Sequence, residues 1–220
     1  SDISLTINKN SGDVVKASAK VIKTKAATDL AISPDSQSVL NKIEQLEAAS
    51  VEFAKQVSEQ LIGQYKPSDD EQALGNFIAD SHRYAMQADL AVMNRGGVRA
   101  TLSAGDVRWG DLFAIQPFSN LLVVKEYSGK QLTPLIMPSA NEKNHYFSQN
   151  VKVVDDQTIM IDGKKIDDSK LYRLAGNAYI MNSERFSNAR LIKTEGLDID
   201  ATIDYIKRLP QPFNLSSQPN

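Results

Sequence analysis

Two stretches, Asn94-Arg-Gly-Gly-Val-Arg99 and Gln116-Pro-Phe-Ser-Asn120, decide how this chain is interpreted. The first follows the apolar run from Ala88 to Met93, which is typical of a buried strand, and its paired glycines permit backbone angles closed to other residues. In the second, the proline fixes its own φ and favours an extended residue before it, so we expect Phe118 to project from a stiff turn. Loops at strand ends often carry binding residues, and both stretches are therefore candidate parts of one site.

The residue types in these stretches suit a polar, anionic ligand with an aromatic part. Asn94 can donate and accept hydrogen bonds, whereas Arg95 and Arg99 are permanent cations whose forked donors match phosphate or carboxylate. The ring of Phe118 can stack on a base. Each signal alone is weak, because a Gly-Gly pair after a strand is most often a tight turn and a single phenylalanine is more often a core residue. Together they favour a nucleotide.

Five motifs between Leu74 and Leu132 occur in a fixed order that narrows the interpretation. They are Leu74-Gly-Asn-Phe-Ile-Ala-Asp80, Ala88-Asp-Leu-Ala-Val-Met-Asn94, the Gly-Gly-Val-Arg loop, Trp109-Gly-Asp-Leu-Phe113 and Gln116-Pro-Phe-Ser-Asn120. At these spacings the set resembles the C-terminal domain of the 5′-nucleotidase family, which includes UDP-sugar hydrolases and 2′,3′-cyclic-nucleotide phosphodiesterases. The resemblance extends over roughly residues 36 to 208. Strand and helix patterns are interspersed without strict alternation, so we predict an α+β fold with a mixed β-sheet flanked by helices.

The resemblance implies roles for individual residues. Asn94 matches the family asparagine that hydrogen-bonds the base side of the ligand, and Arg99 matches an arginine that reaches the phosphate or ribose side. Phe118 and Tyr179 match the two aromatics that sandwich the base. Glu184 can stand in for the family aspartate that accepts hydrogen bonds from ribose hydroxyls. The predicted substrate site also includes Gly96, Gly97 and Asn120.

Two departures from the family pattern concern this site. Family members commonly carry an arginine shortly before Leu-Gly-Asn, but residues 67 to 73 contain no cation here. The family segment Gly-Gly-Asp-Gly, followed by an aromatic, is replaced by Asn182-Ser-Glu-Arg-Phe186. We predict that Arg95 is an accessory residue that supplies a replacement charge.

The resemblance also implies a division of labour between two domains. In that family an N-terminal metallophosphoesterase domain holds two divalent metal ions and hydrolyses the phosphoester, while the C-terminal domain binds the nucleoside part. This sequence resembles the second domain alone, since it holds only His82 and His145 and lacks the His-rich motifs that a two-metal site needs. We therefore expect no catalytic residue, metal or cofactor in this chain. The parent protein is expected to be a phosphoric ester hydrolase whose missing N-terminal domain is the partner of this one.

The chain is expected to divide into three parts. Residues 1–33 are predicted to form a β-hairpin that leads in from the missing domain, residues 34–209 to form the substrate-binding domain, and residues 210–220 to be a loosely ordered tail. Apolar residues at near-helical spacing from Val39 to Leu61 predict one long helix up to Gln64.

Composition excludes several classes of function. The formal net charge of −2 gives no reason to propose nucleic acid or an anionic membrane as a partner, since both usually require a basic patch, and no apolar run approaches a membrane span. The chain has no cysteine, which fits both a reducing compartment and an exported bacterial protein. The resemblance alone places the protein outside the cytoplasm, in the periplasm or at the cell surface.

Two alternatives to nucleotide monophosphate recognition stay open. The domain can be a diverged binding module at the cell surface with no nucleotide role, which the two departures favour. It can also serve a parent enzyme of the same architecture that acts on cyclic or sugar nucleotides.

Overall fold

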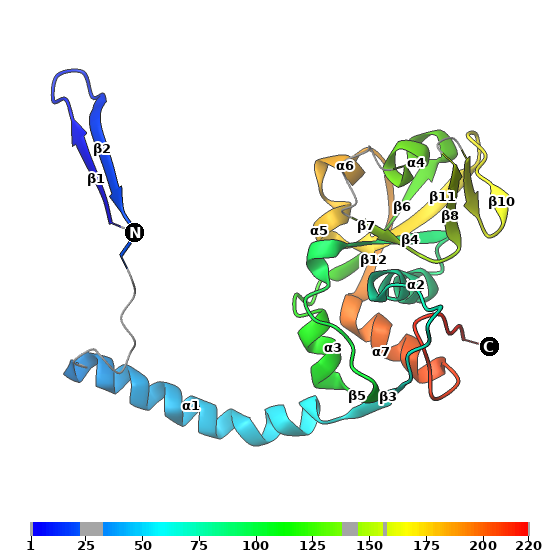
Figure 1. The fold of residues 1–220 in the computed structure, drawn as a ribbon, viewed down its shortest axis with the longest axis horizontal. Helices are drawn as coiled ribbons and strands as arrows, with labels where there is room; N and C mark the ends of the chain where they lie inside the picture. The colour runs from blue at the N-terminus through cyan, green and yellow to red at the C-terminus, as the bar shows by residue number, and fades with distance from the viewer. Residues whose placement is uncertain (1, 23–32, 138–144, 156–157, 220) are drawn as a thin grey trace. The chain divides into compact units, whose positions relative to one another are not determined.

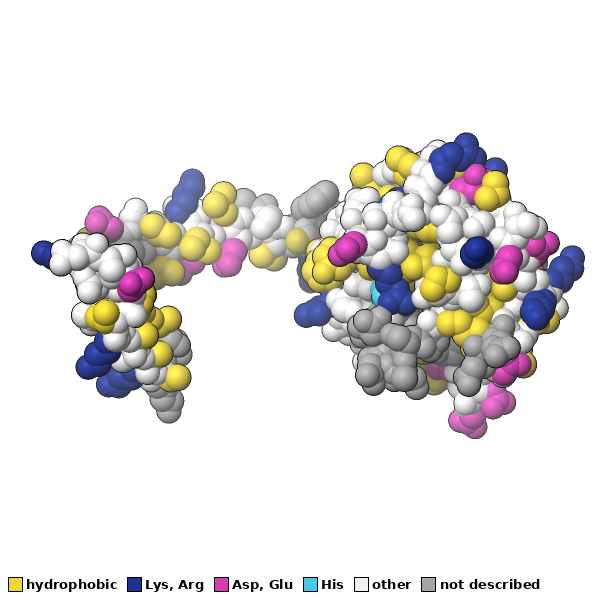
Figure 2. Space-filling model, turned by 90° about the horizontal axis from the view of Figure 1, so that it is seen from above, with side chains coloured by type: hydrophobic (Ala, Val, Ile, Leu, Met, Phe, Trp, Pro, Cys, Tyr) yellow, Lys and Arg dark blue, Asp and Glu magenta, His cyan; other side chains and the backbone are white. Residues whose placement is uncertain are grey.

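The computed structural model describes residues 2–22, 33–137, 145–155 and 158–219, and the chain divides into two compact units, Ser1–Glu52 and Phe53–Asn220. In the first unit, β1 (Asp2–Ile7) and β2 (Val14–Lys20) pair as an antiparallel hairpin (Figure 1). The helix α1 (Pro34–Ser58) begins in this unit and crosses its boundary. Many apolar side chains of these elements stay at the surface (Figure 2). The hairpin agrees with the alternating sequence pattern.

A five-stranded sheet forms the centre of the second unit, with the order β12-β6-β11-β4-β7 (Figure 1). Its strands are β4 (Leu90–Asn94), β6 (Leu121–Ser128), β7 (His145–Phe147), β11 (Leu171–Asn177) and β12 (Arg190–Leu197). β4 and β11 run parallel, whereas the other neighbours are antiparallel. The sheet is therefore mixed, which confirms the predicted α+β class. The first four residues of β4 are all buried, as expected for a continuous apolar run in a sheet covered on both faces.

Helices cover both faces of this sheet. α2 (Leu74–Met86) and α7 (Asp198–Arg208) lie against one face, where Phe77 and Tyr205 belong to the larger core cluster (Figure 1). α4 (Gly129–Ile136), α5 (Ala178–Met181) and α6 (Glu184–Ser187) lie on the opposite side, where Phe186 belongs to a second cluster. No helix within the described residues has both the length and the apolar character needed to cross a bilayer.

Smaller elements surround the central sheet, and one of these strands lies where the sequence predicted the end of a long helix. They are β3 (Leu61–Tyr65), β5 (Gly105–Arg108), α3 (Trp109–Ile115), β8 (Val151–Asp155), β9 (Thr158–Ile161) and β10 (Lys164–Lys165). The helix predicted to reach Gln64 ends at Ser58, and β3 follows as the antiparallel partner of β5. Ile62 and Tyr65, which belong to β3, are buried. Helical spacing of apolar residues therefore continued by coincidence into a segment whose backbone pairs in a sheet.

The prediction of a loosely ordered tail is also corrected, because residues 211–219 include a buried aromatic side chain. Phe213 is fully buried and stacks on Phe77, with ring centroids 5.6 Å apart. Its backbone nitrogen donates to the carbonyl of Gln64, and its carbonyl accepts from the nitrogen of Lys66. The polar composition of the tail predicted disorder, but the burial of one ring and pairing with the end of β3 hold this segment against the core.

Candidate functional site

The glycine loop lies where β4 ends and continues as the 3-10 turn η2 (Arg95–Gly97). Neither glycine adopts a positive φ, so the backbone freedom that the sequence suggested is not used here. Gly97 is required for space instead, because a Cβ there would lie 2.6 Å from Met93 Cε and 2.8 Å from Asn94 Oδ1. A Cβ on Gly96 would meet only Asn94 Nδ2, at an ordinary 3.8 Å. Close packing of Gly97 thus brings the turn against the side chain of Asn94.

Six of the predicted site residues surround one cleft of about 430 Å³. They are Asn94, Gly96, Gly97, Phe118, Asn120 and Tyr179. Phe118 comes from the turn between α3 and β6, and Tyr179 comes from α5, so residues distant in sequence meet here. Both rings are largely exposed, at 55% for Phe118 and 73% for Tyr179, which leaves their faces accessible to a flat ligand. The cleft volume lies within the range of about 300–1,000 Å³ that ligand pockets occupy.

The predicted charged residues lie around this cleft rather than in its lining. The guanidinium carbon of Arg99 is 6.0 Å from the centre of the Phe118 ring, and its Nη1 donates to the carbonyl of Gly96 at 3.3 Å. Arg95 lies over the ring of Tyr146, 4.7 Å from its centre. Glu184 is exposed at the start of α6 and is not among the residues that line the cleft. The arrangement therefore places one guanidinium beside Phe118 and leaves Glu184 apart.

A broader groove of about 870 Å³ continues from the cleft and shares part of its lining. The shared residues are Asn94, Gly96, Asn120 and Tyr179. Its own lining comes from Arg95, His145, Ala178, Ile180, Asn182 and Ser183. Tyr179 thus lines both spaces, whereas Phe118 lines only the cleft. We call the two spaces the cleft and the outer groove.

Asn177, the last residue of β11, joins the two sides of the cleft and was missed by sequence reasoning. Its side chain is 1% exposed. Its Nδ2 donates to Asn94 Oδ1 at 2.9 Å, while its Oδ1 accepts from the backbone nitrogen of Ile180 at 3.1 Å and so caps α5. The same side chain therefore fixes Asn94 and the short helix that carries Tyr179. An asparagine between a strand and a helix is a known N-cap signature, which could have identified the cap but not its contact with Asn94.

Asp198, the first residue of α7, supports Asn120 in a similar way. Its Oδ2 accepts from Asn120 Nδ2 at 3.0 Å, and its backbone nitrogen donates to the carbonyl of Asn120 at 2.9 Å. Burial raises the pKa of this carboxyl group, while the hydrogen bonds from Asn120 and from the Ile199 nitrogen oppose that shift. Nothing in the local sequence indicated this contact, because the two residues are 78 positions apart.

A buried lysine holds the α5–α6 segment against β6. Lys125 Nζ donates to the carbonyls of Met181 and Phe186, and the hydroxyl of Tyr127 donates to the same Phe186 carbonyl at 2.7 Å. Burial lowers the pKa of Lys125. Helices as short as α5 and α6 are not stable alone, so these contacts keep Tyr179 in place.

His82 lies in the core and not at the surface. It is fully buried on α2. Burial lowers its pKa to about 3, against a smaller opposing effect of the Asp198 backbone. The imidazole is therefore neutral at physiological pH and acts as a packing residue.

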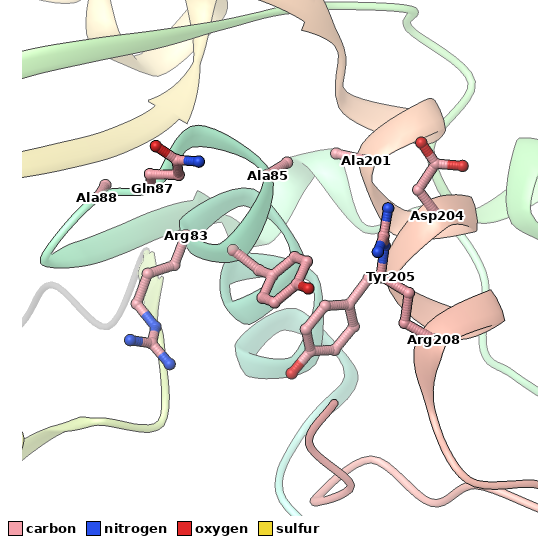
Figure 3. Close-up of a pocket in the computed structure, with 9 residues that line it drawn as sticks. Arg83, Ala85, Gln87, Ala88, Ala201, Asp204, Tyr205 and Arg208 are labelled. Atoms are coloured by element: carbon pink, nitrogen blue, oxygen red, sulfur yellow. The ribbon is translucent and has the colours of Figure 1, made fainter. Parts of the chain in front are cut away.

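A separate hollow of about 650 Å³ lies between the C-terminal ends of α2 and α7 (Figure 3). The rings of Tyr84 and Tyr205 meet edge to face with centroids 5.6 Å apart, and the guanidinium carbon of Arg208 is 5.9 Å from the centre of the Tyr84 ring. In Figure 3, Arg83 and Arg208 project to opposite sides of the hollow. Because its charged groups do not converge, we assign this hollow no ligand.

Metal ligands do not gather in the described parts of the chain. Among residues 2–22, 33–137, 145–155 and 158–219 there is no group of three or more His, Asp or Glu side chains that could hold a metal ion. The described side chains therefore do not fit a two-metal centre. What the cleft and its surroundings offer to a ligand are aromatic rings, amides and guanidinium groups.

A family model and two curated proteins match this chain over most of its length. The model of the family described as "5′-nucleotidase, C-terminal domain" matches residues 54–188. An endonuclease of Bacillus subtilis is 30% identical over 231 residues, covering 96% of this chain and 18% of that protein. A cell wall protein of Listeria monocytogenes is 25% identical over 242 residues, covering 94% of this chain and 31% of that protein.

A solved structure shows the same fold. The 5′-nucleotidase precursor from Thermus thermophilus superposes with a TM-score of 0.61 at 18% identity, covering 99% of this chain and 48% of that one. This chain thus spans less than half the length of each of these three proteins.

Proposed function

Because this chain belongs to the family of 5′-nucleotidase C-terminal domains, we propose that it is the nucleotide-recognition part of a larger hydrolase. One observation carries this proposal: Phe118 and Tyr179, from separate segments, line one cleft together with Asn94 and Asn120. Aromatic faces bind bases of any kind by stacking, and amides add directional hydrogen bonds. The ligand class is therefore a nucleotide or nucleoside.

Each residue has a distinct part in this proposal. The base lies between Phe118 and Tyr179, and Asn94 hydrogen-bonds its edge. Arg99, beside the Phe118 ring, faces the ribose and phosphate end, where a planar guanidinium is well suited to an anion. Gly97 keeps the loop close to Asn94. Glu184 as a ribose acceptor requires a change in the α6 segment on binding, because it does not line the cleft.

We place the chemistry itself in the parent protein. The names of relatives include a 5′-nucleotidase and an endonuclease, both hydrolases of phosphoesters. In our proposal a preceding metallophosphoesterase domain holds two divalent metal ions, and this chain delivers the nucleotide to it. A location outside the cytoplasm is supported by the similarity to a cell wall protein.

Binding of AMP and adenosine to this chain, measured by calorimetry, tests the proposal. Phe118→Ala should weaken binding by about 1–3 kcal/mol, the contribution of one stacked base. Phe113→Ala is the matched control, because Phe113 is 40% exposed but stacks on Trp109 and does not line the cleft. Equal affinities of the wild type and Phe118→Ala would rule out base stacking in the cleft.

The second candidate is a binding module at the cell surface without a nucleotide role. It is favoured by the position of Glu184 outside the cleft lining and by the absence of a cation in residues 67–73. A chain of this kind would bind neither AMP nor adenosine in the same calorimetric experiment.

A further inference from the structure

The outer groove is a second space for ligand that one nucleotide does not need. The cleft alone lies within the size range of small-molecule sites, yet the outer groove continues from it over shared residues. Tyr179 is 73% exposed and lines both spaces. An aromatic ring has two faces, and each face can stack on a base.

The outer groove is lined by one cationic side chain, Arg95, which contacts an aromatic ring. Arg95 lines the groove but not the cleft, and its guanidinium lies 4.7 Å from the centre of the Tyr146 ring. That ring is itself confined, because a Cβ on Gly75 would lie only 2.1 Å from its Cδ2. Within the described part of the chain, no carboxylate forms an ion pair with Arg95. The guanidinium is therefore ordered by an aromatic face and available to an anion.

The rest of the outer groove combines polar side chains with apolar and aromatic ones. Asn182 and Ser183 contribute amide and hydroxyl groups, and both are exposed. His145 also lines the groove, and its ring meets the ring of Phe186 edge to face with centroids 5.4 Å apart. A guanidinium, polar side chains and the free face of Tyr179 are what a second nucleotide unit requires.

We propose that this chain recognises a dinucleotide. The first base lies between Phe118 and Tyr179 in the cleft, the phosphodiester lies at Arg95, and the second base stacks on the outer face of Tyr179. This inference rests on the proposed function, since it uses the cleft as the site of the first base. It adds a second subsite and makes Tyr179 a ring shared by two bases.

Calorimetry with AMP and the dinucleoside monophosphate ApA on this chain tests the inference. ApA should bind about fivefold or more tightly than AMP, the gain of one additional stacked base. Phe118→Ala should weaken both ligands by the same factor, because Phe118 lines only the cleft. Tyr179→Ala should weaken ApA by a distinctly larger factor than AMP, because two stacking contacts are lost.

Arg95→Ala supplies an independent readout. It should weaken ApA at least threefold more than it weakens AMP, while Arg173→Ala, an exposed arginine that lines neither space, changes neither affinity. Equal affinities for AMP and ApA, with equal losses in Tyr179→Ala, would overturn the second subsite and leave the proposed function intact. No binding of either ligand would overturn the proposed function itself.

Discussion

The floor and the rim of the cleft are built in opposite ways. The floor consists of Asn94, Gly97 and Asn120 with their supports Asn177 and Asp198, which are linked by hydrogen bonds and close packing. The rim consists of Phe118, Tyr179 and the neighbouring Arg99, all exposed. Because floor residues are held by buried contacts, while rim residues are exposed and make few contacts with the rest of the protein, mutations in the two regions should have different consequences.

The largest expected effect comes from acidification of the core below the floor. Burial lowers the pKa of His82 to about 3 in the folded chain, whereas a solvent-exposed histidine has a pKa of about 6.5, so between these pH values the unfolded state binds the additional proton. The free energy of unfolding should therefore fall as pH decreases, by about 3 kcal/mol between pH 6.5 and 4 from this group alone. Urea unfolding at several pH values measures this.

Comparison with His82→Leu isolates that contribution. The buried carboxyl groups of Asp80 and Asp198 titrate in both proteins, so the difference between the two curves reports His82. Parallel curves for the two proteins would show that His82 does not carry the acid sensitivity.

The next effect is expected at Asn177, where the floor supports the rim. Asn177→Leu leaves Asn94 Oδ1 and the Ile180 nitrogen without their partner, which should reduce stability by about 2 kcal/mol. AMP affinity should fall about tenfold, because Asn94 and Tyr179 lose their common support. Asn177→Ser can still cap α5 but cannot reach Asn94, so it should regain part of the stability without the affinity. Normal AMP binding in both variants would contradict a supporting role.

The same substitution at Gly96 and at Gly97 gives a further test of the difference between floor and rim. Gly97→Ala should cost about 1 kcal/mol or more and weaken AMP binding, because its Cβ meets Met93 and Asn94. Gly96→Ala has open space and an ordinary φ, so stability should stay within about 0.5 kcal/mol of the wild type or rise slightly. Thermal unfolding and calorimetry of the pair give the result, and equal behaviour would place both glycines in the rim.

The smallest effect should be that of Phe118→Ala on folding. The ring is 55% exposed, so the free energy of unfolding should change by less than about 0.5 kcal/mol although AMP affinity falls. A loss of stability comparable to that of Asn177→Leu would show that Phe118 belongs to the core and not to the rim.

The residues that line the cleft were easier to predict from sequence than the residues that support them. Phe118 follows a proline turn and the glycine loop follows an apolar run, so both carry local signals, and the structure places them around one cleft. Asn177 and Asp198 act on residues 83 and 78 positions away, and a local pattern cannot record such contacts. Their bonding roles became evident only with the sheet and helix packing.

The fold was predictable where periodicity and burial agree. The mixed sheet and α7 follow from continuous apolar runs and from a clear helical stripe. The predictions for the end of α1 and for the tail were wrong for different reasons. Leu61 continues a helical spacing although its backbone pairs with Arg108, and Phe213 lies in a polar tail although its ring is buried.

The bond between Asn177 and Asn94 has a consequence for discrimination between bases. Asn177 occupies one lone pair of the Asn94 carbonyl oxygen, so in the proposed complex the amino end of this amide is the group with more capacity to meet a base. A heterocycle that presents a ring nitrogen or a keto oxygen there is matched, whereas one that presents an amine meets a second donor. In the proposed complex, selection by polarity is thus set by a buried neighbour that lines neither the cleft nor the outer groove.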